Sequence, residues 1–179
     1  MKSSLSTIEY VALVLALFAL GVGSRFLPHP PDATAVTAVL FASATYLSLR
    51  TSLMLLLSLL LVSDLIIGSY ELPVMLSVYG SFLLIGIIGI LFARLESIRG
   101  RILVLASASV LFFLITNTAL WFFTPWYPKD FAGLVTAYTL ALPFFRNMLV
   151  GDFLYVPAVL AACALALKPR ARASSAYAH

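Results

Sequence analysis

The stretch that decides the fold class is Ser52–Tyr70, with the sequence SLMLLLSLLLVSDLIIGSY. Its only charged side chain is that of Asp64. A helix needs about 20 mostly apolar residues to cross the hydrocarbon core of a bilayer. The whole chain agrees with this pattern, since it is 63% hydrophobic and 10% charged with a mean hydropathy of +1.08. Soluble domains carry about 25% charged residues, so the sequence predicts an integral membrane protein.

Comparable apolar runs lie on both sides of this stretch, and turn-forming residues separate them. Phe131–Leu142 is too short to span, so it predicts an interfacial or re-entrant helix that ends at Pro143. We therefore expect an all-α bundle of six transmembrane helices, with this short helix before the last crossing. Residues 1–168 would form one transmembrane domain, and residues 169–179 a disordered cytoplasmic tail. The other predicted crossings are Ile8–Phe26, Thr34–Leu49, Met75–Leu95, Ile102–Phe123 and Phe144–Leu167, the last kinked at Pro157.

The distribution of Lys and Arg predicts the orientation, because cytoplasmic ends of membrane helices are enriched in both. One set of helix ends carries Lys2, Arg50, Arg94, Arg99, Arg101, Lys168, Arg170 and Arg172; the other carries Arg25, Lys129 and Arg146. The richer set indicates that both termini are cytoplasmic. The alternative is a cleaved signal peptide ending near Ser24, which Glu9 close to the start argues against.

Several classes of function are disfavoured by what the sequence lacks. The net charge of +4 is explained by topology, and no basic stripe with interleaved aromatics predicts nucleic-acid binding. Cys163 is the only cysteine, so an internal disulfide or a thiolate zinc cage is not expected. No phosphate-binding loop, zinc-protease motif or nucleophile elbow is present, so we expect no enzyme and no cofactor.

Polar residues inside the apolar runs mark the candidate site. Asp64 lies roughly 9 Å below the outer end of its helix, at about 1.5 Å per residue, where an isolated charge costs several kcal/mol. Either Arg25 or Arg146 pairs with Asp64 or Asp152 and fixes helix packing, or the same groups line an outward-facing cavity for a polar solute. The two interpretations are compatible. The candidate binding residues are Arg25, His29, Asp64, Asn117, Arg146, Asn147 and Asp152.

Two further patterns bear on a ligand and on a partner. Trp121, Trp126, Tyr127 and Tyr70 could cover the cavity, although Trp126 and Tyr127 also fit an aromatic belt at the membrane surface. Ala12 and Ala16 form a small-xxx-small pattern that lets another helix approach closely.

Three blocks of sequence carry a resemblance to a known family: RFLPHPP at residues 25–31, SDLIIG at 63–68, and LPFFRN at 142–147 followed by Gly151-Asp152. Together they resemble small bacterial membrane proteins related to the substrate-binding S components of energy-coupling factor (ECF) vitamin transporters. That group includes the solitary cobalamin transporters of BtuM type.

The resemblance implies a six-helix S-component fold in the bacterial cytoplasmic (inner) membrane, with a substrate pocket open to the outside. It also implies that Ala12 and Ala16 dock on an ECF-type coupling module. In BtuM-type proteins an outer cysteine ligates cobalt, whereas Cys163 lies at the opposite end. Cobalamin would therefore need His29, Met75 or no protein ligand.

The sequence thus favours a solute-uptake protein that binds a vitamin-like small molecule, with cobalamin or a related corrinoid as one candidate. The first alternative is a structural or assembly subunit whose polar cluster only fixes helix packing. The second is a membrane enzyme that uses Asp64 and Asp152 as an acid/base pair.

Overall fold

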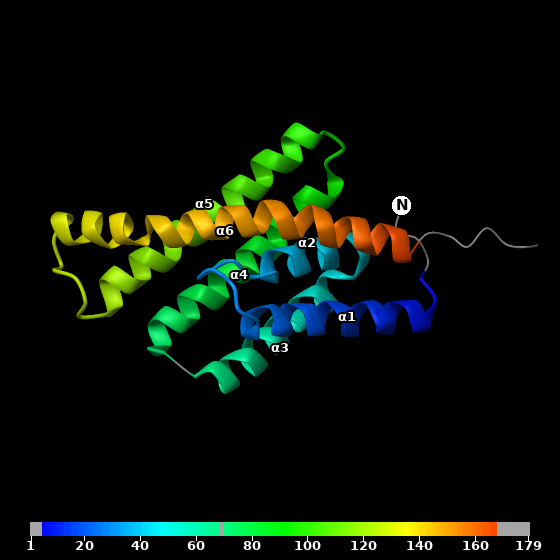
Figure 1. The fold of residues 1–179 in the computed structure, drawn as a ribbon, viewed down its shortest axis with the longest axis horizontal. Coiled ribbons are helices and arrows are strands. Elements are labelled where there is room, and N and C mark those ends of the chain that lie inside the picture. The colour runs from blue at the N-terminus through cyan, green and yellow to red at the C-terminus, as the bar shows by residue number, and fades with distance from the viewer. Residues whose placement is uncertain (1–4, 69, 168–179) are drawn as a thin grey trace, which may run out of the picture.

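Six helices make up the computed structural model, which describes residues 5–68 and 70–167, and no strand occurs in these residues. Figure 1 shows them side by side in one elongated bundle. The predicted all-α fold is confirmed. The helices are α1 (Thr7–Phe26), α2 (Val36–Tyr46), α3 (Leu49–Ile67), α4 (Leu72–Arg94), α5 (Ile98–Phe123) and α6 (Phe131–Ala166).

The helix starts follow from local sequence, because side-chain oxygens satisfy backbone N–H groups that have no partner in the first turn. Ser6 and Glu9 form a capping box at α1. Ser48 accepts from the N–H of Thr51 at α3, and Ser97 accepts from that of Gly100 at α5. The bounds of α1, α3, α4 and α5 lie within four residues of the predicted ones.

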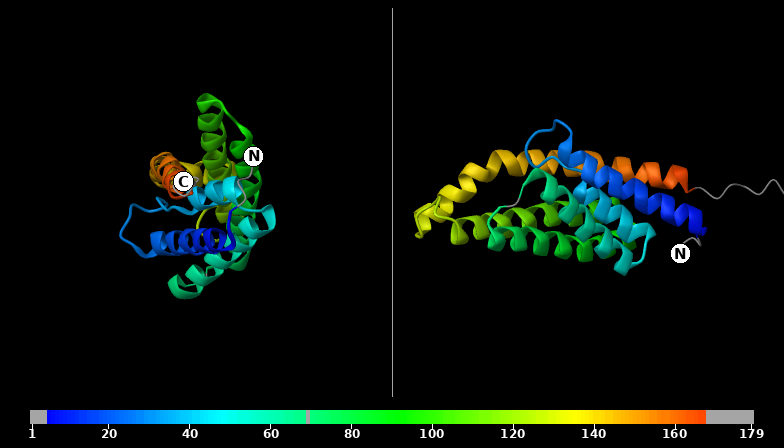
Figure 2. Two further views of the ribbon diagram at one scale, coloured as in Figure 1. Left: turned by 90° about the vertical axis from the view of Figure 1, so that its right-hand side faces the viewer. Right: turned by 90° about the horizontal axis from the view of Figure 1, so that it is seen from below.

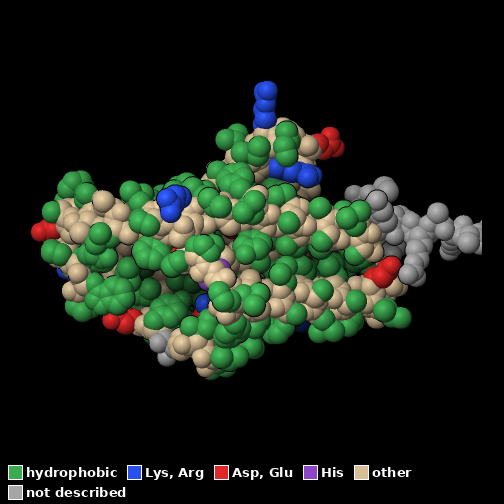
Figure 3. Space-filling view, viewed as in Figure 1, with side chains coloured by type: hydrophobic (Ala, Val, Ile, Leu, Met, Phe, Trp, Pro, Cys, Tyr) green, Lys and Arg blue, Asp and Glu red, His purple; other side chains and the backbone are tan. Residues whose placement is uncertain are grey.

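Five helices, α1, α3, α4, α5 and α6, are long and apolar enough to cross a membrane. Large apolar side chains are exposed along all of them, such as Leu15 on α1, Leu61 on α3 and Leu103 on α5. Figure 3 shows that apolar side chains dominate the face it presents, with charged groups at scattered points. An exterior of this kind suits lipid rather than water, in agreement with the predicted multi-pass membrane protein.

The second predicted crossing is corrected. The prediction was a helix over Thr34–Leu49, but α2 covers only Val36–Tyr46 and is about 16 Å long at 1.5 Å per residue. It does not need to reach the membrane surface, because it packs against α1, α3, α4 and α6 and its first eight residues are all buried. Non-helical backbone is tolerated at membrane depth where protein surrounds it.

The chain nevertheless runs up and down six times. Thr51 at the start of α3 contacts Tyr10 near the start of α1, while Asp64 near the end of α3 contacts Arg25 at the end of α1. These contacts make α1 and α3 parallel, so α2 returns between them. In Figure 1 the start of α1 and the end of α6 lie at the same end of the bundle. This arrangement agrees with termini on one side; their cytoplasmic placement remains a prediction.

The predicted break at Pro143 is also corrected, because α6 is one helix of 36 residues that includes both Pro143 and Pro157. At about 54 Å it exceeds the roughly 30 Å hydrocarbon core. Its N-terminal part curves toward α5 (Figure 2). Neighbouring helices and local adjustment let membrane helices keep proline. The interfacial or re-entrant position of Phe131–Leu142 stays a prediction. The predicted tail, residues 169–179, lies outside the described residues.

The contact between α2 and α4 depends on two glycines of α4. A Cβ at Gly89 would lie 3.2 Å from Cδ1 of Phe41 and 3.3 Å from Cβ of Ala44, both on α2. At Gly86 the nearest atom, Cδ2 of Leu40, would be 3.6 Å away, an ordinary contact. Phe41 is fully buried and its ring centroid lies 4.6 Å from that of Phe92, so it has little room to move.

We expect Gly89→Ala to destabilise the bundle by about 1–3 kcal/mol, the usual cost of overpacking a core. Gly86→Ala is the matched control and should be neutral or slightly stabilising, since alanine favours helix over glycine. Thermal unfolding of both variants in the same detergent measures the difference. Equal melting temperatures for the two variants would contradict the close α2–α4 contact.

Candidate functional site

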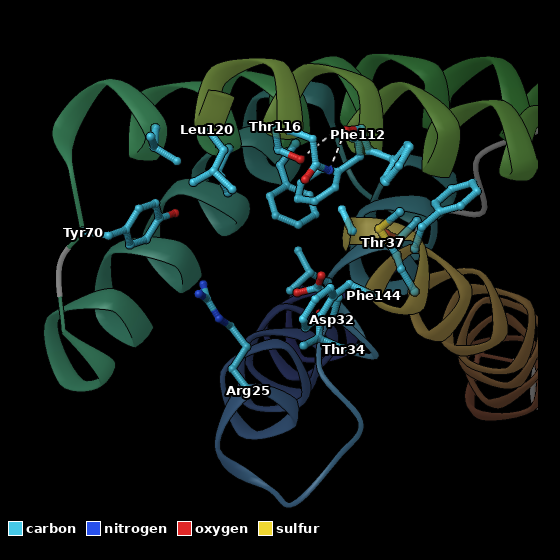
Figure 4. A pocket seen from close by; sticks show the side chains of 18 of the residues that line it. Arg25, Asp32, Thr34, Thr37, Tyr70, Phe112, Thr116, Leu120 and Phe144 are labelled. Atoms are coloured by element: carbon cyan, nitrogen blue, oxygen red, sulfur yellow. Dashed lines mark hydrogen bonds between the residues drawn. The ribbon is translucent and has the colours of Figure 1, made fainter. Parts of the chain in front are cut away.

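A cavity of about 660 Å³ lies at the end of the bundle where α1 and α3 end and α4 begins. Residues from every helix and from three connecting segments line it. Figure 4 shows Arg25, Asp32, Thr37, Tyr70, Thr116 and Phe144 converging on this space from different elements. Its size falls within the range of about 300–1,000 Å³ that is typical of small-molecule sites.

Two facing helices, α5 and α6, supply 11 of the 24 lining residues, and they do so with similar spacing. On α5 the lining residues are Phe112, Phe113, Thr116, Asn117 and Leu120; on α6 they are Leu140, Ala141, Phe144, Phe145, Met148 and Asp152. Residues separated by three, four, seven or eight positions share one face of a helix. Each helix therefore presents one stripe to the cavity that contains two phenylalanines and at least one polar residue.

One of the predicted ion pairs is present and ties three helices together. The guanidinium of Arg25 donates to Oδ1 of Asp64 at 2.7 Å and to the hydroxyl of Ser63 at 2.8 Å. The phenol of Tyr79, on α4, donates to Oδ2 of Asp64 at 2.8 Å. Asp64 is buried and does not line the cavity, whereas Arg25 does. The structure therefore gives Asp64 a packing role and places Arg25 between the network and the cavity.

Asp152 differs from Asp64 because its partners are hydroxyl groups. Oδ2 of Asp152 accepts from Ser109 of α5 at 2.7 Å, and the hydroxyl of Thr37 of α2 is a second hydrogen-bond neighbour. Only 2% of Asp152 is exposed, yet it lines the cavity. The preceding residue, Gly151, lets the chain before α2 approach, since a Cβ there would lie 3.1 Å from Cα of Ala33.

The loop between α1 and α2 supplies the mouth of the cavity. His29 lines it and its Nδ1 lies 2.8 Å from the carbonyl oxygen of Pro30. Asp32 also lines it and has a positive φ of 66°, a conformation that aspartate tolerates better than most residues. Tyr70 faces them from the α3–α4 connection; burial and the nearby Asp64 raise its pKa to about 12, which keeps its phenol a donor at neutral pH.

The other three predicted binding residues do not all line the cavity. Asn117 lines the cavity, although its amide donates to the carbonyl of Phe113 on its own helix. Arg146 is exposed and Asn147 half-buried, and neither lines the cavity, contrary to the prediction. Helical periodicity explains this, because the wall is made by Phe144, Phe145 and Met148, and positions 146 and 147 turn away from it.

The aromatic cover is partly as predicted. Tyr70, Trp126 and Tyr127 line the cavity, and Trp121 does not. The indole N–H of Trp121 instead donates to the carbonyl of Pro128 at 2.8 Å. Lys129 donates to the carbonyls of Trp121 and Thr124. These bonds hold the α5–α6 loop that carries Trp126 and Tyr127 over the cavity.

Metal ligands do not gather in the described residues, where no group of three or more His, Cys, Asp or Glu side chains could hold an ion. Cys163 is buried near the end of α6, in the half of that helix away from the cavity wall. Of the candidates for cobalt, His29 lines the cavity and Met75 does not. Met148 does line it, although no pattern in the sequence distinguishes it from the other methionines.

Sequence reasoning also missed Thr37, Ser109, Tyr79 and Asp32. Asp32 follows the HPP motif of His29 closely, so its place in the same loop was a usable signal. Thr37, Ser109 and Tyr79 lie within apolar runs that contain several other hydroxyl residues. Only the packing of helices against Asp64 and Asp152 distinguishes these three from the rest.

The Arg25–Asp64 pair can be tested by a double-mutant cycle. Arg25→Ala and Asp64→Ala should each destabilise the protein by about 3–5 kcal/mol, because each leaves a buried charge without its partner. The double variant should lose much less than the sum. Thermal unfolding measures all three, with Glu71→Gln as an exposed charge control. Strictly additive losses would contradict the coupling.

The loop cover can be tested at Gly133, where a Cβ would lie 2.0 Å from the carbonyl oxygen of Pro128. Gly133→Ala should displace the loop and break the bond between Pro128 and Trp121. Trp121 and Trp126 are the only tryptophans in the sequence, so intrinsic fluorescence should report the change directly. The control is Gly80→Ala, which meets nothing within 4 Å. An unchanged emission spectrum in Gly133→Ala would contradict this account of the loop.

A protein-family model described as "Family of unknown function (DUF6580)" matches residues 5–175. No curated protein and no solved structure matches the chain.

Proposed function

Because the chain belongs to the DUF6580 family, which has no assigned function, we propose a function from the site itself: a membrane solute-uptake protein that binds a vitamin-like small molecule. The observation that carries the proposal is the cavity of about 660 Å³ lined by residues of all six helices. Largely apolar walls with a few convergent polar groups are what small-molecule sites have in common. The cavity opens outward if the predicted orientation holds.

The size of the cavity bears on the solute. A volume of about 660 Å³ suits a drug-sized molecule better than a whole corrinoid. No cysteine lines the cavity to ligate cobalt. Among vitamin-like molecules we therefore favour one smaller than cobalamin, while the relation to S components of ECF transporters remains part of the proposal.

Inward release of the solute would require reorientation of the bundle or a coupling partner. Ala12 and Ala16 are exposed on α1, while Leu13 and Leu17 beside them are buried in the bundle. A helix face with small exposed residues permits close approach by another helix. This position supports, as a proposal, docking of an ECF-type coupling module on α1.

The second candidate function is a structural or assembly subunit. It is favoured by the network of Arg25, Asp64 and Tyr79, which links α1, α3 and α4. Asp64, at the centre of this network, does not line the cavity. The same network is compatible with solute binding, because Asp152, which lines the cavity, does not belong to the network. An acid/base pair of Asp64 and Asp152 has less support, since Asp64 is engaged on both oxygens away from the cavity.

The proposal predicts that a small molecule co-purifies with the protein and can be identified by mass spectrometry. Re-addition at about 100 times its Kd should stabilise the protein by about 2.7 kcal/mol. For a chain of this size that is a rise of roughly 5–10 °C in Tm. A protein that is empty and unmoved by a vitamin panel would favour the structural-subunit function.

A matched pair of variants on α6 locates the binding. Ala141 lines the cavity, so the larger side chain of Ala141→Trp should occupy part of the cavity and reduce the bound solute at least about tenfold. Ala132 lies on the same helix, is exposed and does not line the cavity, so Ala132→Trp should retain the solute. Equal retention by both variants would place the molecule elsewhere.

A further inference from the structure

We infer that the solute taken by this cavity is an organic cation, and that Asp152 is the carboxylate that recognises its positively charged nitrogen. The inference rests on the proposed function, because it takes the cavity as a solute site. It is argued from the balance of charge around the cavity, the position of Asp152, and the aromatic character of the walls.

The charge balance of the cavity is negative. Among the described residues that line it, Arg25 is the only Lys or Arg, and its guanidinium is already paired with Asp64 at 2.7 Å. Asp152 and Asp32 also line the cavity, and neither forms an ion pair with Arg25. With its guanidinium neutralised, the cavity presents an excess of carboxylate. A site of this sign attracts cations and repels anionic solutes.

Asp152 has capacity left for a ligand. An ionised carboxylate can accept about four hydrogen bonds, and the neighbours of Asp152 are the hydroxyls of Ser109 and Thr37. The single hydroxyl proton of Ser109 is also directed at the carbonyl of Leu105, 3.1 Å away, so this partner is shared. Because Asp152 is 2% exposed and lines the cavity, a group that reaches its free lone pairs must come from the cavity.

The start of α2 argues against an anionic solute. Val36 and Thr37, the first two residues of α2, line the cavity, and a helix N-terminus attracts negative charge. Asp152 already brings a carboxylate to Thr37. The position that would favour an anion is therefore occupied by the protein's own negative charge.

The walls suit a cation with a flat apolar body. Phe82 and Phe112 pack with ring centroids 4.6 Å apart, and so do Phe113 and Phe145; all four line the cavity. Aromatic faces attract cations through the ring quadrupole, by about 0.5–2 kcal/mol according to exposure, and offer stacking surface to planar groups. Asp152 together with these aromatic side chains would select a ligand that has both a positive charge and a planar apolar group.

Three probes of similar size and different charge test the inference on the full-length protein in phosphatidylcholine nanodiscs. They are benzylamine, which is protonated at neutral pH, benzamide, which is neutral, and phenylacetate, which is anionic. Isothermal titration calorimetry, with empty nanodiscs as the blank, should show binding of benzylammonium in preference to the other two. Ala141→Trp should abolish this binding, which places the probe in the cavity.

Asp152→Asn should weaken benzylammonium binding roughly 10- to 100-fold, as expected for loss of a charge-assisted hydrogen bond. Asp130→Asn makes the same charge change at the exposed start of α6, where asparagine caps equally well, and should bind as the wild type does. If Asp152→Asn does not fold, the preference of the wild type among the three probes still decides the sign of the charge.

The contrary outcomes are distinct. Preferred binding of phenylacetate, or equal benzylammonium binding by Asp152→Asn, would overturn the inference and leave solute binding intact. A second contrary outcome is stabilisation of the protein by Na⁺ that is lost in Asp152→Asn, with no stabilisation by benzylammonium. Asp152 would then bind an inorganic cation, and the inference of an organic cation would be overturned. If no probe binds and no molecule co-purifies, the proposed function fails and the inference fails with it.

Discussion

The structure depends first on one buried ion pair, between Arg25 at the end of α1 and Asp64 near the end of α3. Two charges at this depth are tolerable only when they are paired and hydrogen-bonded, because each alone would cost several kcal/mol. Ser63 and Tyr79 complete the bonding. The pair therefore fixes α1 parallel to α3 and joins α4 to both, and it determines where the end of α1 meets the cavity.

Once α1 and α3 are parallel, the short helix α2 must return between them. Because neighbouring helices bury most of α2, an 11-residue helix can take the place of the full-length membrane crossing that was expected. The close α2–α4 contact at Gly89, and the close approach of Ala33, just before α2, to Gly151 of α6, both follow from that position. These contacts bring Thr37, at the start of α2, against Asp152. The packing of α2 in the core therefore also forms part of the cavity wall.

The two carboxylates of the bundle thus have separate roles. Asp64 is neutralised by a cation and supports packing, whereas Asp152 has only hydroxyl partners and faces the cavity. In sequence they look alike, since each is a single acid inside an apolar run. The partner supplied by another helix makes the difference: a guanidinium satisfies a carboxylate in charge as well as in hydrogen bonding, and two hydroxyls satisfy it only in part.

The sequence by itself determined the helical fold, the approximate bounds of α1, α3, α4 and α5, and the polar end that holds Arg25, His29, Asn117 and Asp152, because hydropathy, capping and burial cost are local properties. The tertiary structure alone decided the rest. Continuation of α6 through Pro143 moved Arg146 away from the cavity, since one unbroken helix fixes the direction of each side chain by its periodicity. Likewise, the choice of Arg25 as the partner of Asp64 depends on which helices are parallel, and that results from packing between distant segments.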